Sequence, residues 1–239
     1  MRTAVFVLAL APWLASCGGG REITLTFEGL VGGQPAACGG VYAGIGTTGT
    51  ELTLLDYRLY VHDVRLVTDD GREVPLELEQ NEWQHENVAL LDFEGGDGCD
   101  SGTVSTNSVV RGVVAEDATF TGVRFRLGVP FALNHADVST APPPLNYTSM
   151  FWSWNAGYKF VRVEGRTTGL TDGWRLHLGS IGCEGDGRGN VTSCAAANVA
   201  DVELTGFDPD VDTIAADLAD LLADSNLDTD EGGQLGCMS

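Results

Sequence analysis

The residues with the clearest potential for chemistry are the four histidines, since imidazole is a common metal ligand and general base. They are His62, His85, His135 and His177. One of them stands two residues after a tryptophan, in Trp83-Gln84-His85. In an extended segment residues i and i+2 point to the same side, so this indole and this imidazole share a face on which the imidazole could bind a metal. The spacing alone favours a simpler interpretation, in which Trp83 belongs to the core and His85 is a solvated loop residue.

A second chemically rich segment covers residues 150–160. Five aromatic residues surround the sole lysine of the chain, Lys159. Met150 opens the segment and offers a thioether, which is a soft metal ligand. An aromatic core layer accounts for most of these side chains. Trp152 and Trp154 lie two residues apart and would share a face that can stack on a sugar, so a carbohydrate-binding or adhesive surface module is the alternative function.

Signatures of the common enzyme classes are missing from the sequence. It contains no HExxH, GxSxG, P-loop or dinucleotide-binding motif. The least supported hypothesis is catalysis by His135 with a carboxylate such as Asp137. The enzyme classes that leave such fingerprints are therefore not expected.

The composition narrows the partners and the fold. The 239 residues include 34 Asp and Glu against 13 Lys and Arg, a net charge of −21, which excludes a basic surface for nucleic acid or anionic lipid. The 32 glycines and the modest charge content indicate a turn-rich β protein. An acidic stretch, residues 208–230, ends in alternating side chains at Asp224, Asn226, Asp228 and Asp230. These resemble EF-hand ligands, but Thr229 stands where the loop needs glycine, so calcium is not expected there.

Alternating apolar and polar residues predict roughly eight strands with turn residues between them, the pattern of an all-β sandwich or Greek-key domain with long loops. The expected strands are 23–27, 52–67, 73–78, 87–93, 109–114, 121–127, 158–166, 174–178 and 198–204. Ile214, Leu218, Leu221 and Leu222 recur at helical spacing and predict a short C-terminal amphipathic helix.

The N-terminus has the features of a targeting signal. A positive start and an apolar stretch, residues 4–14, are followed by Leu14-Ala15-Ser16-Cys17 and three glycines, as in a bacterial lipobox. We expect residues 1–16 to be the signal peptide and residues 17–21 to be the lipidated Cys17 with a flexible tether, which anchors a domain of residues 22–239 in the periplasm or at the cell surface. The alternative is an ordinary secretory signal cut near Ser16.

The remaining cysteines belong to an oxidising compartment. Cys183 and Cys194 bracket a glycine-rich loop and are expected to close it as a disulfide. Cys38 and Cys99 both lie in glycine-rich loops and form the natural second pair. Cys237 is left over. The sequence contains no CxxC pair, so a zinc knuckle is not expected.

Five motifs distributed along the chain combine into a family pattern. They are Tyr60-Val61-His62-Asp63-Val64-Arg65-Leu66, Val88-Ala89-Leu90-Leu91-Asp92-Phe93-Glu94, the segment Phe125–His135 around Leu127-Gly128-Val129-Pro130-Phe131, the segment Pro144–Phe160, and His177-Leu178-Gly179-Ser180 with Gly182-Cys183. Together they resemble the MbnP family of bacterial periplasmic and surface proteins, related to the copper-binding MopE and CorA proteins of methane oxidisers.

This resemblance implies a β-sandwich-like domain that binds one copper ion as Cu(I). It implies that Trp83 is oxidised to kynurenine, whose amine joins His85 and His135 around the metal. Met150, His62 and His177 are further candidates for the metal or for its surroundings. Many relatives keep the Trp-Gln pair but lack the following histidine, which is present here.

The resemblance also implies a partner. A dihaem enzyme of the MbnH type, similar to cytochrome c peroxidases, would oxidise Trp83, so this chain would be a substrate and not an enzyme. An unmodified indole offers only an N–H donor, whereas an aniline-type amine keeps a lone pair at neutral pH. Two imidazoles and such an amine form a low-coordinate set that favours Cu(I) over Cu(II). Relatives continue beyond the position of Ser239 to another cysteine, so we expect Cys237 to be unpaired in this chain.

Overall fold

The structure is a computed structural model that describes residues 20–95, 99, 105–153, 155–186 and 190–230. The expected signal peptide, the lipidated Cys17, Trp154 and Cys237 lie outside the described residues. Within them, no helix combines the length and the apolar character that crossing a bilayer requires.

One sheet is built around the first long strand and has the order β18-β1-β9-β6, with β2 paired to β1. Its strands are β1 (Arg21–Val31), β2 (Gln34–Pro35), β6 (Glu77–Leu78), β9 (Val109–Val114) and β18 (Thr213–Asp217). On β1, Ile23, Leu25 and Phe27 are buried while the residues between them are exposed, as expected where one face of a strand covers a core. β18 runs parallel to β1, whereas the other pairs are antiparallel.

The second sheet has the order β14-β13-β4-β10-β17; β3, β5 and β8 also pair with β4, and β7 pairs with β8. Its strands are β3 (Val41–Ile45), β4 (Thr50–Thr68), β5 (Glu73–Pro75), β7 (Gln84–His85), β8 (Val88–Asp92), β10 (Phe120–Leu127), β13 (Val161–Thr167), β14 (Trp174–Leu178) and β17 (Ala200–Thr205). The main core lies between the two sheets, where Phe27 of β1 contacts Phe125 of β10 edge to face at 5.7 Å. This arrangement confirms the all-β sandwich class.

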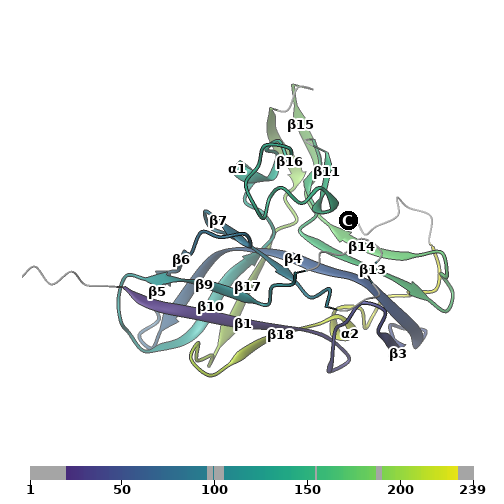
Figure 1. The fold of residues 1–239 in the computed structure, drawn as a ribbon, viewed down its shortest axis with the longest axis horizontal. Helices are drawn as coiled ribbons and strands as arrows, with labels where there is room; N and C mark the ends of the chain where they lie inside the picture. The colour runs from purple at the N-terminus through teal and green to yellow at the C-terminus, as the bar shows by residue number, and fades with distance from the viewer. Residues whose placement is uncertain (1–19, 96–98, 100–104, 154, 187–189, 231–239) are drawn as a thin grey trace, which may run out of the picture.

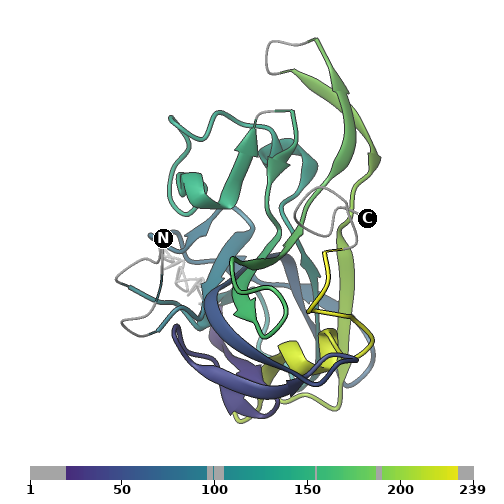
Figure 2. The same ribbon diagram turned by 90° about the vertical axis from the view of Figure 1, so that its right-hand side faces the viewer.

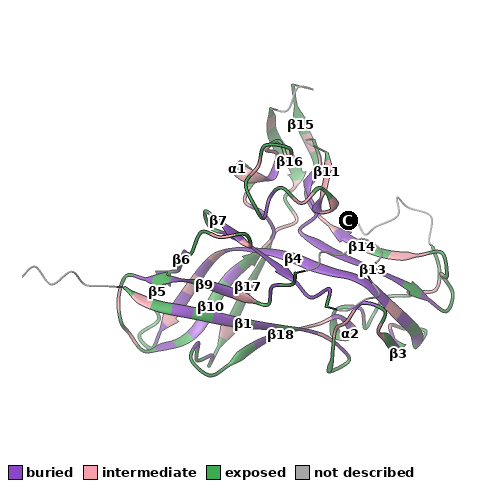
Figure 3. Ribbon diagram, in the orientation of Figure 1, coloured by how far each residue is buried: buried purple, intermediate pink, exposed green. Residues whose placement is uncertain are grey.

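A smaller lobe, residues 128–153, 155–160, 181–186 and 190–196, rises above β4 (Figure 1). Its elements are α1 (Phe131–Asn134), the 3₁₀ helix η1 (Thr148–Met150), the pair β11 (Phe151–Ser153) with β12 (Gly157–Tyr158), and the pair β15 (Ile181–Gly185) with β16 (Val191–Ala196). Seen from the side, the green β15–β16 hairpin extends past the teal α1 region (Figure 2). Much of β4 is buried while this hairpin is largely accessible (Figure 3).

The two faces of β4 serve two different cores. Tyr57, Leu59 and Val61 enter the main core. Tyr60, on the opposite face, packs in a second buried group, here called the lobe cluster. The lobe cluster consists of Tyr60, Val88, Leu90, Val129, Leu145, Met150, Tyr158 and Phe160. The lobe therefore covers a strand face that would otherwise be exposed to solvent.

Most sequence-based strands agree with the structure, but the expected strand 73–78 is divided into β5 and β6, which pair in different sheets, the expected strand 158–166 is divided between β12 and β13, and β2 and β3 were not predicted. The C-terminal segment also differs. Ile214, expected on a helix, lies on β18, and the helix is limited to α2 (Leu218–Leu221). The residues before it extend because they pair with β1 in register, Ile214 opposite Phe27. The β15–β16 hairpin was predicted only as a disulfide-closed loop.

Candidate functional site

Gln84 and His85 form β7, and Trp83 lies in the turn just before it. Gln84 is 2% exposed, and its side chain points towards β9. Its amide nitrogen donates to the carbonyl oxygens of Glu79 at 2.8 Å and Arg111 at 2.7 Å, and its Oε1 accepts from the Arg111 N–H at 2.7 Å. The carbonyl oxygen of Trp83 accepts from the Leu90 N–H at 2.9 Å, so the pairing with β8 continues to Trp83, whose side chain packs against the lobe cluster.

His85 lies on the face of the lobe cluster. His85 pairs with Val88 on β8, and Val88 pairs with His62 on β4. Directly opposite residues in antiparallel strands share a face, so the three side chains form one row across β7, β8 and β4. His85 is half-buried, with 28% of its side chain exposed and its Nε2 3.6 Å from Glu86 Oε1.

The indole of Trp83 is half-buried against the lobe cluster. Its ring stacks on that of Tyr147, with 6.1 Å between ring centroids and 23° between planes. Met150 is fully buried in the same cluster. Trp83 therefore belongs partly to this second core, while one side of its ring system stays accessible.

His62 connects β4 to the start of the lobe. Its ring is buried, and Nδ1 lies 2.8 Å from the carbonyl oxygen of Gly128. A carbonyl can only accept, so Nδ1 carries the proton and Nε2 keeps the lone pair. Burial lowers the pKa of His62, which favours this neutral form. The anchored Gly128 begins the loop that leads into α1.

His135 follows α1 and is oriented by its neighbour Asn134. The Oδ1 of Asn134 accepts the backbone N–H of Tyr158 at 2.8 Å, so its Nδ2 is the atom 3.3 Å from His135 Nε2. An amide nitrogen can only donate, and His135 Nε2 must therefore carry a lone pair. This packing requires a glycine at position 157, where φ is +80° and an added Cβ would lie 2.4 Å from Asn134 Oδ1.

The same nitrogen of His135 lies beside a disulfide. His135 Nε2 is 3.5 Å from Cys194 Sγ. Cys183 and Cys194 are directly opposite each other on β15 and β16 and are bonded, as the sequence predicted. The predicted pair Cys38–Cys99 is also confirmed.

His177, on β14, belongs to a buried ionic network. Its Nε2 lies 2.7 Å from Glu164 Oε1, and its ring is 6.2 Å from that of Trp152. Hydrogen bonds from His177 and Arg162 hold the pKa of Glu164 well below its ordinary value despite burial. His177 is thus a buried, paired histidine.

The ionic network continues beneath the lobe, and the sequence alone did not predict it. Asp56 accepts from Arg58 Nε at 3.0 Å and lies 2.9 Å from Arg162 Nε. Burial, together with the neighbouring Asp56, raises the pKa of Glu94 to about 8. Burial lowers the pKa of Lys159 to about 8.

Comparison with protein families matches residues 20–239 to the MbnP family. The chain belongs to the MbnP family. Among solved structures, MbnP from Methylosinus trichosporium is similar, with a TM-score of 0.80 and 31% identity, over 91% of this chain and 82% of that chain. No curated protein sequence matches it. The resemblance inferred from the five motifs is therefore confirmed.

Trp152, one of the two tryptophans suggested for sugar stacking, packs inside the protein's own structure. Trp152 packs against His177, and its ring approaches so close to Gly179 that a Cβ there would lie 2.5 Å from Cζ3. The ring of Trp152 is therefore engaged in packing against its neighbours. Trp154, its expected companion, is among the residues that the structure does not describe.

Two other carboxylates considered for chemistry hold local structure. Asp137 accepts hydrogen bonds from the backbone N–H and the hydroxyl of Ser139, at 2.9 and 2.7 Å. Asp228 accepts from the hydroxyls of Thr48 and Thr50, both at 2.6 Å. The bonds of Asp228 tie the acidic segment to the chain at the start of β4.

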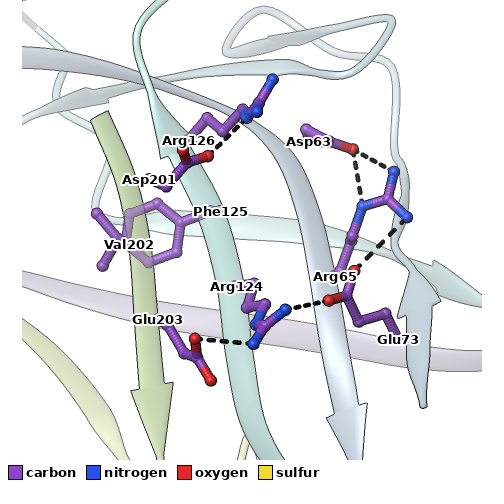
Figure 4. Close-up of a pocket in the computed structure, with 9 residues that line it drawn as sticks. All are labelled: Asp63, Arg65, Glu73, Arg124, Phe125, Arg126, Asp201, Val202 and Glu203. Atoms are coloured by element: carbon purple, nitrogen blue, oxygen red, sulfur yellow. Dashed lines mark hydrogen bonds and ion pairs between the residues drawn. The ribbon is translucent and has the colours of Figure 1, made fainter. Parts of the chain in front are cut away.

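A surface pocket of about 440 Å³ lies over β4, β10 and β17 (Figure 4). Three arginines line it, and each is paired with a carboxylate from the same sheet. The pairs are Arg65 with Asp63, Arg124 with Glu73 and Glu203, and Arg126 with Asp201. Because acids outnumber the arginines, this pocket has no excess positive charge with which to hold an anion.

Proposed function

We propose that this chain binds one copper ion, as Cu(I), on the face that Trp83 and His85 share. His85 and His135 supply imidazole nitrogens, and Trp83, once oxidised to kynurenine, supplies an amine. A dihaem peroxidase-like partner carries out the oxidation, so the chain is a substrate in that reaction and not an enzyme. A signal peptide directs export, and the lipidated Cys17 then holds the domain at a bacterial membrane, in the periplasm or at the cell surface.

The observation that carries the proposal is the rigid direction of Trp83 and His85. Three hydrogen bonds fix the side chain of Gln84, the residue between them, and the indole stacks on Tyr147. A ligand set is useful only if its donors converge without large rearrangement. Trp83 and His85 lie on the side of the lobe cluster and are both partly accessible, which supports the proposal.

The donor chemistry fits copper. Imidazole nitrogens suit copper, and His135 carries its lone pair on Nε2. Leu133 packs against the lobe cluster, and Asn134 accepts from the backbone N–H of Tyr158, a member of that cluster. His135 comes directly after these two residues and therefore borders the same cluster as Trp83. Bound copper would be an exchangeable soft cation, available for storage, sensing or transfer.

The protein's own side chains prepare this site. The lobe cluster shields one side of Trp83 from water, and Tyr147 holds the plane of the indole. His62 keeps the Gly128 loop in place, which positions α1 and hence His135. Met150 lies fully buried beneath this face, where it contributes to packing.

The test is a mass measurement and a copper count on protein purified together with its dihaem partner. Loss of one carbon and gain of one oxygen add about 4 Da to the Trp83 peptide. We expect that shift together with about one bound copper, and His85→Ala and His135→Ala should each weaken copper binding by more than about 100-fold. His177→Gln, which alters a histidine paired with Glu164, is the control and should keep copper. Tight copper binding in either alanine variant would remove that ligand from the proposal.

A further inference from the structure

A second group of metal donors lies on the lobe, separate from Trp83 and His85. The Sγ atoms of Cys183 and Cys194 and a ring nitrogen of His135 all lie within 4.8 Å of one another. His135 Nε2, which carries the lone pair, is the nitrogen 3.5 Å from Cys194 Sγ. In the disulfide form the sulfurs are not thiolates and cannot act as strong ligands.

We propose that reduction of the Cys183–Cys194 disulfide creates a binding site for a d¹⁰ cation, Zn²⁺ or Cu(I), held by two thiolates and His135. A dithiol reductant attacks one sulfur, and the S–S bond breaks through a mixed disulfide. The reductant becomes a disulfide, and its two electrons and two protons leave both cysteines as thiols. The metal ion then displaces the two thiol protons.

The spacing of the donors suits one small cation. Around a tetrahedral zinc, a thiolate sulfur and an imidazole nitrogen lie about 3.6 Å apart and two sulfurs about 3.8 Å apart. The observed 3.5 Å between His135 Nε2 and Cys194 Sγ matches the first spacing. The second needs only a small separation of the two sulfurs after reduction, which side-chain rotation provides.

The backbone keeps the donors together when the disulfide is open. Cys183 and Cys194 are registered by the β15–β16 ladder, which pairs Ile181 with Ala196 on one side and Glu184 with Ser193 on the other. His135 follows Asn134, which is anchored to the backbone N–H of Tyr158, and a metal ion on His135 Nε2 would replace the contact from Asn134 Nδ2. Two thiolates with one imidazole form a soft donor set that selects Zn²⁺ and Cu(I) over hard cations.

Access to the site is open to both reductant and metal. Cys183, Cys194 and His135 are half-buried, and most side chains of the hairpin are exposed or half-buried. The chain's net charge of −21 attracts cations to its surface. The site needs neither Trp83 nor its modification, so it does not depend on the copper proposal above.

The experiment uses the full chain produced without any dihaem partner, so that Trp83 stays unmodified. Zn²⁺ is titrated anaerobically against a chromophoric chelator, before and after treatment with a dithiol reductant. Co²⁺ serves as a spectroscopic probe, since thiolate ligands give an intense charge-transfer band. A Cu(I) titration with a Cu(I)-specific chelator then decides which cation binds more tightly.

Reduced wild-type protein should bind one more Zn²⁺ per chain than the oxidised form. The double variant Cys183→Ser/Cys194→Ser keeps Cys38 and Cys99, so any binding it gains on reduction measures the other thiols and is subtracted. His135→Gln, which keeps both thiols, should weaken binding by about 10- to 100-fold.

Ser193→Ala, a change on the same strand, is the matched control and should bind as wild type. Equal Zn²⁺ binding by the reduced wild type and the double variant, or a Co²⁺ band of the same intensity in both, would overturn the proposal. Binding that is unchanged in His135→Gln would overturn the assignment of the imidazole.

Discussion

Replacing Gln84 with leucine tests whether this buried amide sets the direction of Trp83 and His85. Leucine has similar bulk but removes three hydrogen bonds at 2.7 to 2.8 Å, two donated to carbonyl oxygens and one accepted from the Arg111 N–H. Each contributes roughly 1 kcal/mol net, so the free energy of unfolding should fall by about 3 kcal/mol.

Urea unfolding followed by tryptophan fluorescence measures this change, with the slope of the transition checked for a constant m-value. Gln34→Leu is the matched control, because Gln34 is exposed on the short edge strand β2. A decrease for Gln84→Leu no larger than that for Gln34→Leu would refute the reasoning, and the argument for a fixed Trp83–His85 face would fail with it.

Two further predictions concern the lobe and the buried charges. Gly157→Ala should lower the thermal unfolding midpoint strongly, by an amount equivalent to about 2 kcal/mol or more, because the φ of residue 157 is +80° and the added Cβ would collide with Asn134. Calorimetry measures the midpoint. The control is Gly95→Ala, where an added Cβ meets nothing within 4 Å. Glu94 has a folded-state pKa of about 8 against an ordinary value of 4.5, so between these values the folded state holds a proton that the unfolded state has released. Stability should therefore decrease as the pH rises through this window, and Glu94→Gln, which cannot titrate, should flatten the dependence measured by urea unfolding; an equally steep slope in the variant would contradict the assignment.

Much of the sandwich could be predicted from local patterning. The alternation in Ile23-Thr24-Leu25-Thr26-Phe27 sets the inner and outer faces of β1, and the long apolar run from residue 52 predicted β4. Both disulfides followed from the glycine-rich context of their cysteines. The strand faces and the Cys183–Cys194 pair, which are 11 residues apart, depend on near neighbours in sequence, whereas Cys38 and Cys99 are 61 residues apart and were paired from the character of their loops.

The C-terminal segment shows where local pattern fails. Ile214 and Leu218 stand at helical spacing, but pairing of β18 with β1 extends the chain through Asp217. The carboxylate of Asp217 then accepts from the Ala219 N–H and caps the short helix α2. A partner strand nearly 200 residues earlier decides the conformation, and no periodicity within the segment reports it.

The outer face of β4 is a second case. Asp56, Arg58 and His62 alternate with apolar residues and are typical of a strand facing water. The structure buries all three, because the lobe packs on that face and supplies partners such as the hydroxyl of Ser149 for Arg58 and the carbonyl of Gly128 for His62. The role of Gln84 was equally hidden, since its partners come from the loop before β7 and from β9.

His135 is where the two proposed sites meet. It borders the lobe cluster through Asn134, and it faces Cys194 through Nε2. A single imidazole nitrogen has one lone pair and can bind one metal ion at a time. If both sites exist, they cannot both use His135 Nε2 at once, and the redox state of the Cys183–Cys194 pair would then decide whether this nitrogen is available to the Trp83–His85 face. Copper retained by the oxidised protein and weakened on reduction, with no such change in Cys183→Ser/Cys194→Ser, is the pattern that this competition requires.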